Sequence, residues 1–483
     1  MNIHLILQMA ADAMGHREAI IAGNRRITYA ELAEMARAVA GHAKSDEKIA
    51  YLSETSPLMP AALFGSALAG TQFVPLNYRL AKEQIDALLN RTTPAVLLTD
   101  KTIDIEGIRP ITLVKAESGE LSDKLAADDD VPVAVELFTS GTTGEPKSAI
   151  LRHSNLMAYI FGTVEFMSAG EDEANLIAVP PYHIASIAAV LSSTYAGRKM
   201  VQLPNFTPEA WISLARAENV TNAFLVPTML QRIVDFAGDN IELPNLRNIA
   251  YGGGKMPRPT IEKAMELLPN VNFTNAYGLT ETSATICMLG PDDHRECYKS
   301  DNPAIRRRLG SAGRPIPSIE LQVRNEDGQE CAAEELGLVW VRGDQVSGEY
   351  KGAGSQLDDE GWFPTKDRGY IDSGGYLFID GRADDVIVRG GENISPGEIE
   401  EVIRMHAAIK DVAAVAVADL EWGEAVGLAI VCDGDVDDEE LCELVRSNLR
   451  SSRLPSVIKR WDELPYNETG KLLRRVIRDS FAG

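Results

Sequence analysis

What this sequence has little of already narrows its class. Cysteine occurs five times in 483 residues, and no two cysteines form a Cys-x-x-Cys pair. Neither a disulfide framework nor a zinc site is therefore indicated, and a reducing cytoplasm is the expected location. No apolar run is long enough to cross a membrane, and the start, Met1 to Met9, lacks the basic residues that open a signal peptide.

Positive charge is also scarce. The 47 Lys and Arg residues face 71 Asp and Glu residues, which gives a formal net charge of −24 at pH 7. Such an acidic chain is repelled by nucleic acid and by anionic lipid, so we expect neither as a partner. An anionic small-molecule substrate must then be drawn in by local basic groups. The composition leaves the oligomeric state open between monomer and homodimer.

Two common catalytic motifs are missing as well, namely an activating His–Asp or Cys–His pair and a Walker A loop. The stretch from Phe138 to Lys147, FTSGTTGEPK, follows the largely apolar run Val131 to Leu137, which predicts a strand. It has Pro146 where a Walker A loop needs its second Gly. It still suits a polyphosphate, because glycines allow close approach, hydroxyl and N–H groups donate to phosphate oxygens, and Lys147 offsets charge. The alternative is a Ser/Thr/Gly-rich surface turn.

The order of predicted strands and helices indicates an α/β protein with largely parallel sheet. Four predicted strands, at 176–179, 223–226, 248–251 and 271–275, each run into a loop of small, aromatic or hydroxyl residues. Ligands of open α/β sheets bind at the carboxyl ends of the strands, so these loops are candidate walls of one site.

The chain changes character near residue 381. Residues 310–341 are β-like, whereas the residues after 381 form a compact αβ pattern in which Ser395 and Glu398 predict a capping box. Thr28 and Glu31 predict another capping box near the start of the chain. We therefore predict two domains. Residues 1–383 form a large N-terminal domain of parallel-rich sheets with helices and a β-subdomain. Residues 384–483 form a small, mobile C-terminal α+β lid domain hinged at Asp384.

Further short stretches carry groups suited to nucleotide chemistry. Glu281, among the hydroxyl residues of Tyr277 to Thr282, can bind Mg²⁺ through its carboxylate, or it is an exposed Glu after a turn. Asp367 can accept hydrogen bonds from a ribose diol, or it is satisfied by its own turn. Arg382 offers a donor to the same sugar.

Two stretches near the end of the chain complete this set. Gly390 and Gly391 allow close approach of the backbone to a ligand. Lys471 follows a Gly in a predicted loop, where a Lys either reaches a substrate or is simply solvated.

In this order the stretches resemble the adenylate-forming superfamily, which includes acyl-CoA and aryl-CoA ligases, peptide-synthetase adenylation domains and luciferases. The resemblance covers residues 15–478, and two stretches, Pro181 to His183 and Gly381 to Asp385, are most similar to the CoA-ligase branch. It implies ATP and Mg²⁺, together with CoA or a carrier-protein phosphopantetheine.

The resemblance also implies a role for each matching residue. The phosphate loop comprises Thr139, Ser140, Gly141, Thr142, Thr143, Gly144 and Lys147. Other nucleotide-binding positions are Gly252, Gly253, Gly254, Asn275, Ala276, Tyr277, Gly278, Asp367 and Arg382. The catalytic positions are Lys471, the adenylation lysine, Glu281 and Thr280 at the metal and α-phosphate, and His183. Glu281 and Thr142 would bind the metal, Asp384 is the hinge, and Gly390 and Gly391 line the thiol tunnel.

The acyl pocket is expected to be aromatic, formed by Tyr182, His183, Phe224, Tyr251 and Tyr277. Three positions depart from the family pattern. Ser148 stands where the phosphate loop usually has Gly, and Lys255 follows the triple Gly where Ala is usual. Residues 364–366, Pro-Thr-Lys, replace the common Arg-Thr-Gly. The last two departures leave the mouth of the acyl pocket and its local charge open.

The resemblance implies a two-step reaction in which a carboxylate attacks ATP, pyrophosphate leaves, and the acyl group of acyl-AMP passes to the thiol of CoA. Members that activate amino acids place an Asp near residues 180–185, where this chain has no acid. We therefore expect an acid without an α-amino group, either aryl or medium-chain acyl. The alternative acceptors are a carrier-protein phosphopantetheine and an amine. A nucleotide-binding protein without catalysis is a third possibility, which Lys471, Glu281 and Asp367 oppose.

Overall fold

The computed structural model describes residues 1–44, 46–122, 133–139, 146–467 and 472–481. The chain forms two compact units. The first unit contains Met1–Glu320 and Arg342–Phe363, and the second contains Leu321–Val341 and Pro364–Gly483. Each unit combines helices with sheets of its own, which confirms the predicted α/β class. The hinge at Asp384 stays a prediction.

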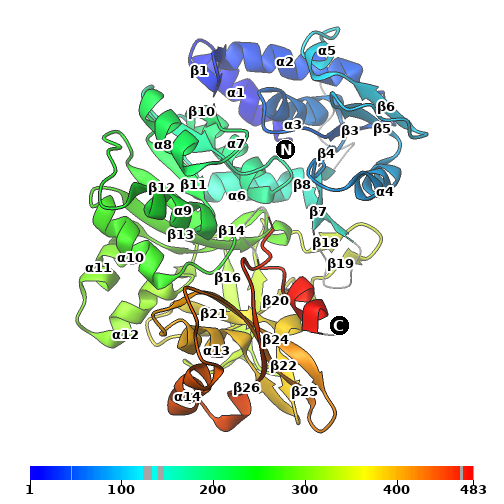
Figure 1. The fold of residues 1–483 in the computed structure, drawn as a ribbon. Coiled ribbons are helices and arrows are strands. Elements are labelled where there is room, and N and C mark those ends of the chain that lie inside the picture. The colour runs from blue at the N-terminus through cyan, green and yellow to red at the C-terminus, as the bar shows by residue number, and fades with distance from the viewer. Residues whose placement is uncertain (45, 123–132, 140–145, 468–471, 482–483) are drawn as a thin grey trace. The chain divides into compact units, whose positions relative to one another are not determined.

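A nine-stranded sheet forms one part of the first unit, in the order β15-β14-β13-β12-β11-β9-β10-β1-β2 (Figure 1). The pairs from β1 through β10, β9, β11 and β12 to β13 are parallel, and the pairs at both edges are antiparallel. The strands are β1 (Glu18–Ala22), β2 (Arg25–Thr28), β9 (Ala174–Ile177), β10 (Lys199–Gln202), β11 (Asn222–Leu225), β12 (Asn248–Gly252), β13 (Asn272–Leu279), β14 (Ala284–Leu289) and β15 (Arg314–Pro315).

An eight-stranded sheet forms the other part of the first unit, in the order β19-β18-β8-β7-β4-β3-β5-β6. Its central strands are short and buried at every residue except Lys48, as expected for parallel strands covered on both faces. The strands are β3 (Lys48–Tyr51), β4 (Phe73–Pro75), β5 (Ala95–Leu98), β6 (Ile108–Ile111), β7 (Val133–Thr139), β8 (Lys147–Arg152), β18 (Glu349–Tyr350) and β19 (Gly354–Ser355).

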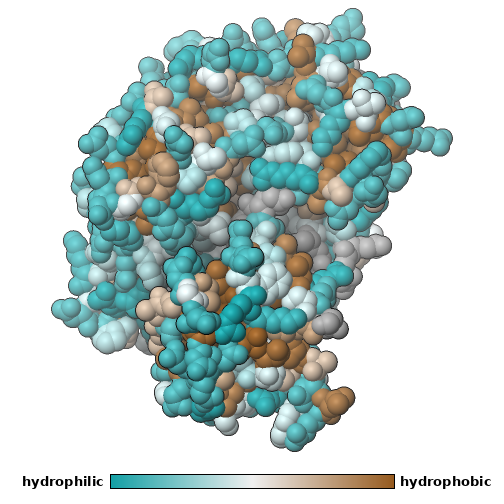
Figure 2. All heavy atoms as spheres, in the orientation of Figure 1, coloured by the Kyte–Doolittle hydropathy of each residue, from teal (hydrophilic) through white to brown (hydrophobic). Residues whose placement is uncertain are grey.

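Helices cover both sheets of the first unit (Figure 1). One core includes Tyr29 and Phe64, and a second includes Trp211 and Phe273. Hydrophilic side chains cover most of this unit's visible surface in Figure 2. The helices are α1 (His4–Met14), α2 (Tyr29–His42), α3 (Leu58–Ala69), α4 (Lys82–Thr92), α5 (Leu113–Ala116), α6 (His153–Thr163), α7 (Ile184–Ala196), α8 (Pro208–Ala217), α9 (Pro227–Ala237), α10 (Arg258–Leu267), α11 (Pro291–Lys299) and α12 (Pro303–Arg306).

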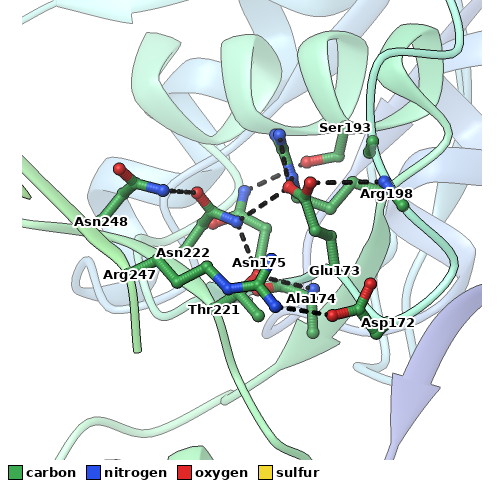
Figure 3. Close-up of polar contacts among 12 residues, drawn as sticks. Asp172, Glu173, Ala174, Asn175, Ser193, Arg198, Thr221, Asn222, Arg247 and Asn248 are labelled. Atoms are coloured by element: carbon green, nitrogen blue, oxygen red, sulfur yellow. Dashed lines mark hydrogen bonds and ion pairs between the residues drawn. The ribbon is translucent and has the colours of Figure 1, made fainter. Parts of the chain in front are cut away.

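A ladder of asparagine side chains crosses the amino ends of three neighbouring parallel strands, and Figure 3 shows its part from Asn248 through Asn222 to Thr221. Asn272 Nδ2 donates to Asn248 Oδ1 at 3.1 Å, and Asn248 Nδ2 donates to Asn222 Oδ1 at 2.9 Å. Asn222 in turn donates to Thr221 Oγ1 at 2.7 Å. Because each amide both donates and accepts, a slip of one strand by one residue would break the ladder. The ladder therefore fixes the register of β11, β12 and β13.

Strand β13 is longer than its sequence predicts. The expected strand ends at Asn275, but β13 continues to Leu279 because β14 pairs with it antiparallel, with Tyr277 opposite Cys287. Ala276, Tyr277 and Gly278 are therefore strand residues rather than loop residues.

The second unit has two sheets. The four-stranded sheet has the order β16-β17-β20-β21, and the other has the order β23-β22-β25-β24 with β26 paired to β25. The strands are β16 (Glu320–Arg324), β17 (Gly337–Arg342), β20 (Phe363–Ile371), β21 (Leu377–Arg382), β22 (Ile387–Arg389), β23 (Glu392–Ile394), β24 (Ile409–Asp419), β25 (Gly423–Cys432) and β26 (Pro455–Arg460). The helices are α13 (Pro396–Ile403), α14 (Asp438–Asn448) and α15 (Arg474–Phe481).

Sequence signals at helix starts are met to different degrees. At α2 both halves of a capping box form, since Thr28 N donates to Glu31 at 2.7 Å and Glu31 N donates to Thr28 Oγ1 at 3.2 Å. At α13 Ser395 caps the helix, but the carboxylate of Glu398 accepts from Arg453 at 2.8 Å. The predicted second half of that box is therefore not formed. None of the helices in the described ranges has the length and apolarity to cross a bilayer.

Candidate active site

The β7–β8 hairpin holds both ends of the predicted phosphate loop. Thr139, the last residue of β7, pairs with Lys147, the first residue of β8. Ser140, Gly141, Thr142, Thr143 and Gly144 lie outside the described residues, so their predicted contacts stay predictions. The hairpin places the two described ends of the loop side by side, as a loop that closes around a ligand requires.

Lys147 is linked to Glu281 through a residue that the sequence did not single out. The Nζ atom of Lys147 lies 5.7 Å from the centre of the Tyr350 ring. The hydroxyl of Tyr350 donates to Glu281 Oε1 at 2.5 Å. The structure thus brings together two predicted residues, the loop lysine and the metal-binding carboxylate, around one tyrosine. The roles of both residues at a bound ligand stay predictions.

The backbone around Glu281 is held by the segment 345–350. Glu281 lies with Thr280 in a short 3₁₀ turn, η1 (Thr280–Thr282). The N–H groups of Ser347 and Gly348 donate to the Glu281 carbonyl at 2.9 and 3.1 Å. The Gln345 side chain donates to the carbonyls of Thr282 and Thr285 at 3.1 and 2.8 Å. Glu281 is therefore fixed through both its side chain and its backbone by one segment.

The strand ends of the nine-stranded sheet explain part of the glycine pattern. A Cβ atom on Gly252, the last residue of β12, would lie 2.2 Å from the Ala276 carbonyl oxygen, so only Gly fits there. Gly253 and Gly254 follow it and are exposed. Asn275 Nδ2 donates to the Ser311 carbonyl at 2.8 Å. The predicted nucleotide positions on β12 and β13 are thus neighbours in one ladder.

The predicted acyl-pocket residues Phe224 and Tyr251 do not face the same side. Leu225 on β11 pairs with Tyr251, so Phe224 and Tyr251 point to opposite faces of the pleated sheet. Tyr251 is 0% exposed, and its hydroxyl lies 2.8 Å from His294 Nε2 in the core. A Cβ atom on Gly252 would lie 3.6 Å from Phe224, which places Phe224 on the face where Gly252 lies.

Tyr182 and His183 belong to an aromatic cluster at the start of α7. Their ring centres are 4.5 Å apart, and the Tyr182 ring meets the Tyr78 ring edge-on at 5.8 Å. Arg79 lies over the Tyr78 ring, with its guanidinium carbon 5.3 Å from the ring centre. Tyr78 and Arg79 were not singled out from the sequence. They follow the buried strand β4, and their place after a predicted strand could have identified them as candidate site residues.

His183 is neutral at physiological pH. Burial lowers its pKa to about 4, and the charge of Arg79 acts in the same direction. Its Nε2 atom is buried and makes no hydrogen bond to any residue that the structure describes. A buried polar atom without a partner costs free energy, which a ligand that supplies the hydrogen bond would recover. This property fits the predicted place of His183 in a substrate pocket.

In the second unit, the buried Asp367 pairs with the half-buried Arg382. They are opposite each other on β20 and β21, and Arg382 Nη1 donates to Asp367 Oδ1 at 3.0 Å. Arg382 directly precedes a 3₁₀ turn, η3 (Ala383–Asp385), which contains Asp384. The structure thus brings together the two residues expected to contact a ribose.

Gly390 and Gly391 form the tight turn of the β22–β23 hairpin. Both have positive φ, 57° and 84°, as a two-residue type I′ turn requires. A Cβ atom on Gly390 would lie 2.7 Å from Trp422, whose carbonyl accepts from Gly390 N at 2.8 Å. Trp422 is 46% exposed and was not singled out from the sequence. The thiol-tunnel role of these glycines stays a prediction.

Lys471 lies outside the described residues. The chain on either side of residues 468–471 is anchored to β24. Tyr466 donates to Asp411 Oδ2 at 2.7 Å, and burial raises the pKa of Asp411. Arg474 donates to the Ala414 carbonyl at 2.6 Å and pairs with Glu400.

Comparison with protein families gives two matches. A family described as AMP-binding enzyme matches residues 7–351, and one described as AMP-binding enzyme C-terminal domain matches residues 398–471. These matches confirm the resemblance to adenylate-forming enzymes.

Several named proteins are similar over at least 95% of their own length. Feruloyl-CoA synthase of Amycolatopsis sp is 30% identical, with 96% of each chain covered. The 2-succinylbenzoate–CoA ligase of Bacillus mycoides (strain KBAB4) is 28% identical, covering 96% of this chain and 95% of the relative. The o-succinylbenzoate CoA synthetase MenE of Bacillus subtilis with the acyl-adenylate OSB-AMP has a TM-score of 0.86, 27% identity and 98% coverage of each chain. The same enzyme with ATP and a magnesium ion has a TM-score of 0.84 and 28% identity, covering 97% of this chain and 98% of the solved chain.

Proposed function

Because the chain belongs to the family of AMP-binding enzymes, we propose that it is an acid–CoA ligase that works through acyl-AMP. The observation that carries this proposal is that Tyr350 contacts both Lys147, at the start of β8, and Glu281. It brings together a cation and a carboxylate, which are the groups that a polyphosphate with its metal ion would need.

The residues present fit a magnesium ion. Mg²⁺ is commonly held by one or two carboxylates together with substrate phosphates and water. Glu281 is buried and accepts a hydrogen bond from Tyr350 on Oε1, and no residue in the described ranges hydrogen-bonds to its Oε2. That oxygen would be the ligand, and Thr142 would add a hydroxyl. When bound, the ion would offset phosphate charge during attack on the α-phosphorus.

In the first step, a carboxylate oxygen of the acid attacks the α-phosphorus of ATP, and the bond to pyrophosphate breaks. No general base is needed, because a carboxylic acid is already ionised near pH 7. Lys147 would bind the departing β- and γ-phosphates, and Thr280 would donate to the α-phosphate. We assign Lys471 to the charge that develops on the α-phosphate. Asp367 and Arg382 would bind the ribose, and the ends of β12 and β13 the adenine.

For the acid, we propose an aryl carboxylate without an α-amino group. The two relatives named above act on feruloyl and succinylbenzoyl groups. In this chain, the cluster of Tyr78, Tyr182 and neutral His183 offers ring faces and one buried nitrogen for an aromatic acid with a polar substituent. The segment 180–185, with no acidic residue, does not provide a partner for an α-ammonium group.

In the second step, the thiol of CoA attacks the acyl carbonyl, and AMP leaves. We propose that the chain between Arg382 and Val386 rotates at Asp384 between the two steps. The turn at Gly390 and Gly391 would then line the path of the thiol. Because ATP and CoA are supplied inside the cell, we place the enzyme in the cytoplasm.

The test is an acid-dependent exchange of labelled pyrophosphate into ATP, run over a panel of aryl, medium-chain and amino acids. We expect exchange with aryl acids. Exchange confined to amino acids, or absent for the whole panel, would contradict the proposal. The acyl-AMP formed is then offered to CoA, to a holo-carrier protein and to simple amines. Consumption by the carrier protein or an amine alone would replace CoA as the acceptor.

A further inference from the structure

A charged carboxylate is buried in the strand that leads to the phosphate loop. Glu136 lies on β7 among apolar residues and is 0% exposed. Burying an unpaired charge is strongly unfavourable, so such a residue needs strong partners. Glu136 has three: Lys48 Nζ at 2.6 Å, Ser148 Oγ at 2.6 Å and Lys351 Nζ at 3.1 Å. Burial alone would raise the pKa of Glu136, but the hydrogen bonds from Lys48 and Ser148 and the two ammonium charges outweigh it and lower the pKa.

The pleat of β18 connects this cluster to Glu281. Tyr350 pairs with Ala149 on β8, and Lys351 N donates to the Ser148 carbonyl at 2.9 Å. Successive side chains of a strand point to opposite faces. Tyr350 therefore points toward Lys147 and Glu281, while Lys351 points toward Glu136. The ion pair on one face fixes the strand that positions Tyr350 on the other.

The same cluster reaches the end of the phosphate loop. Lys351 Nζ also donates to the Arg91 carbonyl at 3.1 Å. Arg91, near the end of α4, donates from Nη1 to the Pro146 carbonyl at 2.7 Å. Pro146 directly precedes Lys147. Lys147 is therefore positioned through the Arg91 contact with its neighbour Pro146 and through its own contact with the Tyr350 ring.

Ser148 supplies a second reason to connect Glu136 with the site. It stands where a Gly is usual in this family, and a Gly could not donate to Glu136. Ser148 is buried, and its hydroxyl satisfies the same carboxylate oxygen that Lys351 approaches. The departure from the family pattern is thus matched by a buried acceptor on the neighbouring strand.

We propose that Glu136 is a positioning residue for magnesium–ATP binding, which acts through Lys351 and Ser148 on the placement of Tyr350, Glu281 and Lys147. The inference rests on the proposed function, because it takes magnesium–ATP as the ligand. Glu136 itself touches neither the ligand nor the reacting atoms.

The test measures binding directly. Isothermal titration calorimetry with magnesium–ATP, without any acid, gives the Kd of the wild-type chain and of Glu136→Gln. Residues that orient the ligands of a metal typically change its affinity about 10-fold to 100-fold when they are lost, so we expect a Kd weaker by about that factor. The matched control is Glu47→Gln, which removes another buried carboxylate next to the same sheet, paired with Arg109 at 3.1 Å. The control should lower the melting temperature and leave the Kd unchanged.

Lys351→Gln tests whether Glu136 acts through Lys351. It also covers the case in which Glu136→Gln does not fold, because the Lys351 side chain is 44% exposed and its substitution disturbs the core less. We expect it to weaken binding, and we expect Glu136→Gln to add little in the Lys351→Gln background. Ser148→Gly should weaken binding by a smaller factor.

Three results separate the possible failures. If Glu136→Gln, or Lys351→Gln in its place, binds magnesium–ATP as the wild type does, the inference is overturned. Fully additive effects of Glu136→Gln and Lys351→Gln would overturn the route through Lys351. A wild-type chain that binds no magnesium–ATP would instead overturn the proposed function, and the inference with it.

Discussion

Tyr350→Phe is the substitution that tests the candidate site most directly. It removes the hydroxyl that donates to Glu281 Oε1 at 2.5 Å and keeps the ring that lies under Lys147. A hydrogen bond to a charged group contributes about 1.5 to 3 kcal/mol. At about 1.4 kcal/mol for each factor of ten, kcat/KM for magnesium–ATP should fall about 10-fold to 150-fold. Because Glu281 is only 9% exposed, water replaces the lost donor poorly, which favours the upper part of that range.

The assay is the initial rate of acid-dependent pyrophosphate release against magnesium–ATP concentration, at a saturating concentration of the acid found by exchange. Tyr298→Phe is the matched control, since its hydroxyl also contacts a carboxylate, Glu266, at 3.3 Å on an exposed surface. Tyr350→Leu should lose about 0.5 to 1 kcal/mol more, because Lys147 then loses its ring contact. If Tyr350→Phe stays within twofold of Tyr298→Phe, Glu281 does not depend on Tyr350, and the reasoning fails.

Four further outcomes are expected. Lys471→Ala should slow adenylation at least ~10²-fold, the scale for one transition-state donor, while thioester formation from supplied acyl-AMP survives; equal loss in both steps would contradict its assignment. Gly390→Ala, which strains a positive φ and meets Trp422, should slow thioester formation about 5-fold to 150-fold in stopped-flow assays and spare adenylation, since αL strain costs about 1 to 3 kcal/mol and about 1.4 kcal/mol is a factor of ten. For His183, the folded-state pKa of about 4 lies below the ordinary value of 6.5. Between pH 6.5 and pH 4.5 the unfolded chain therefore binds more protons at this residue than the folded chain, and the melting temperature should fall as the pH is lowered. His183→Gln should flatten this fall, and an unchanged slope would refute the burial argument. Asn248→Ala should cost about 1 to 3 kcal/mol of unfolding free energy in urea, with KM unchanged.

The sequence predicted the features that depend on short stretches of chain. The capping box of Thr28 and Glu31 formed, because its two partners are three residues apart. The α/β class followed from the alternation of strands and helices. Asp367 and Arg382 were both expected to contact one sugar, and the structure brings them within hydrogen-bonding distance of each other.

Other features depend on contacts that no local pattern encodes. Tyr350 reaches Glu281 from a strand of two residues, which is formed by its pairing with β8 and β19. Glu136 was contained in a run interpreted as largely apolar, and a buried charge becomes visible only with its partners from β3, β8 and the chain after β18. Tyr251 was grouped with Phe224 because both are aromatic residues of strands that run into candidate site loops, whereas the pleat sends them to opposite faces.

The asparagine ladder places the determinants of strand alignment and of ligand contact at opposite ends of the same strands. Alignment is set at the amino ends of β11, β12 and β13, and the candidate ligand positions lie at or beyond their carboxyl ends. Exchange of the segments after β11 and β12 with those of relatives should therefore leave the strands aligned. This separation makes the scaffold a suitable recipient for grafted loops. Such grafts would change the selectivity for the acid and leave the asparagine side chains at the amino ends of the strands unchanged.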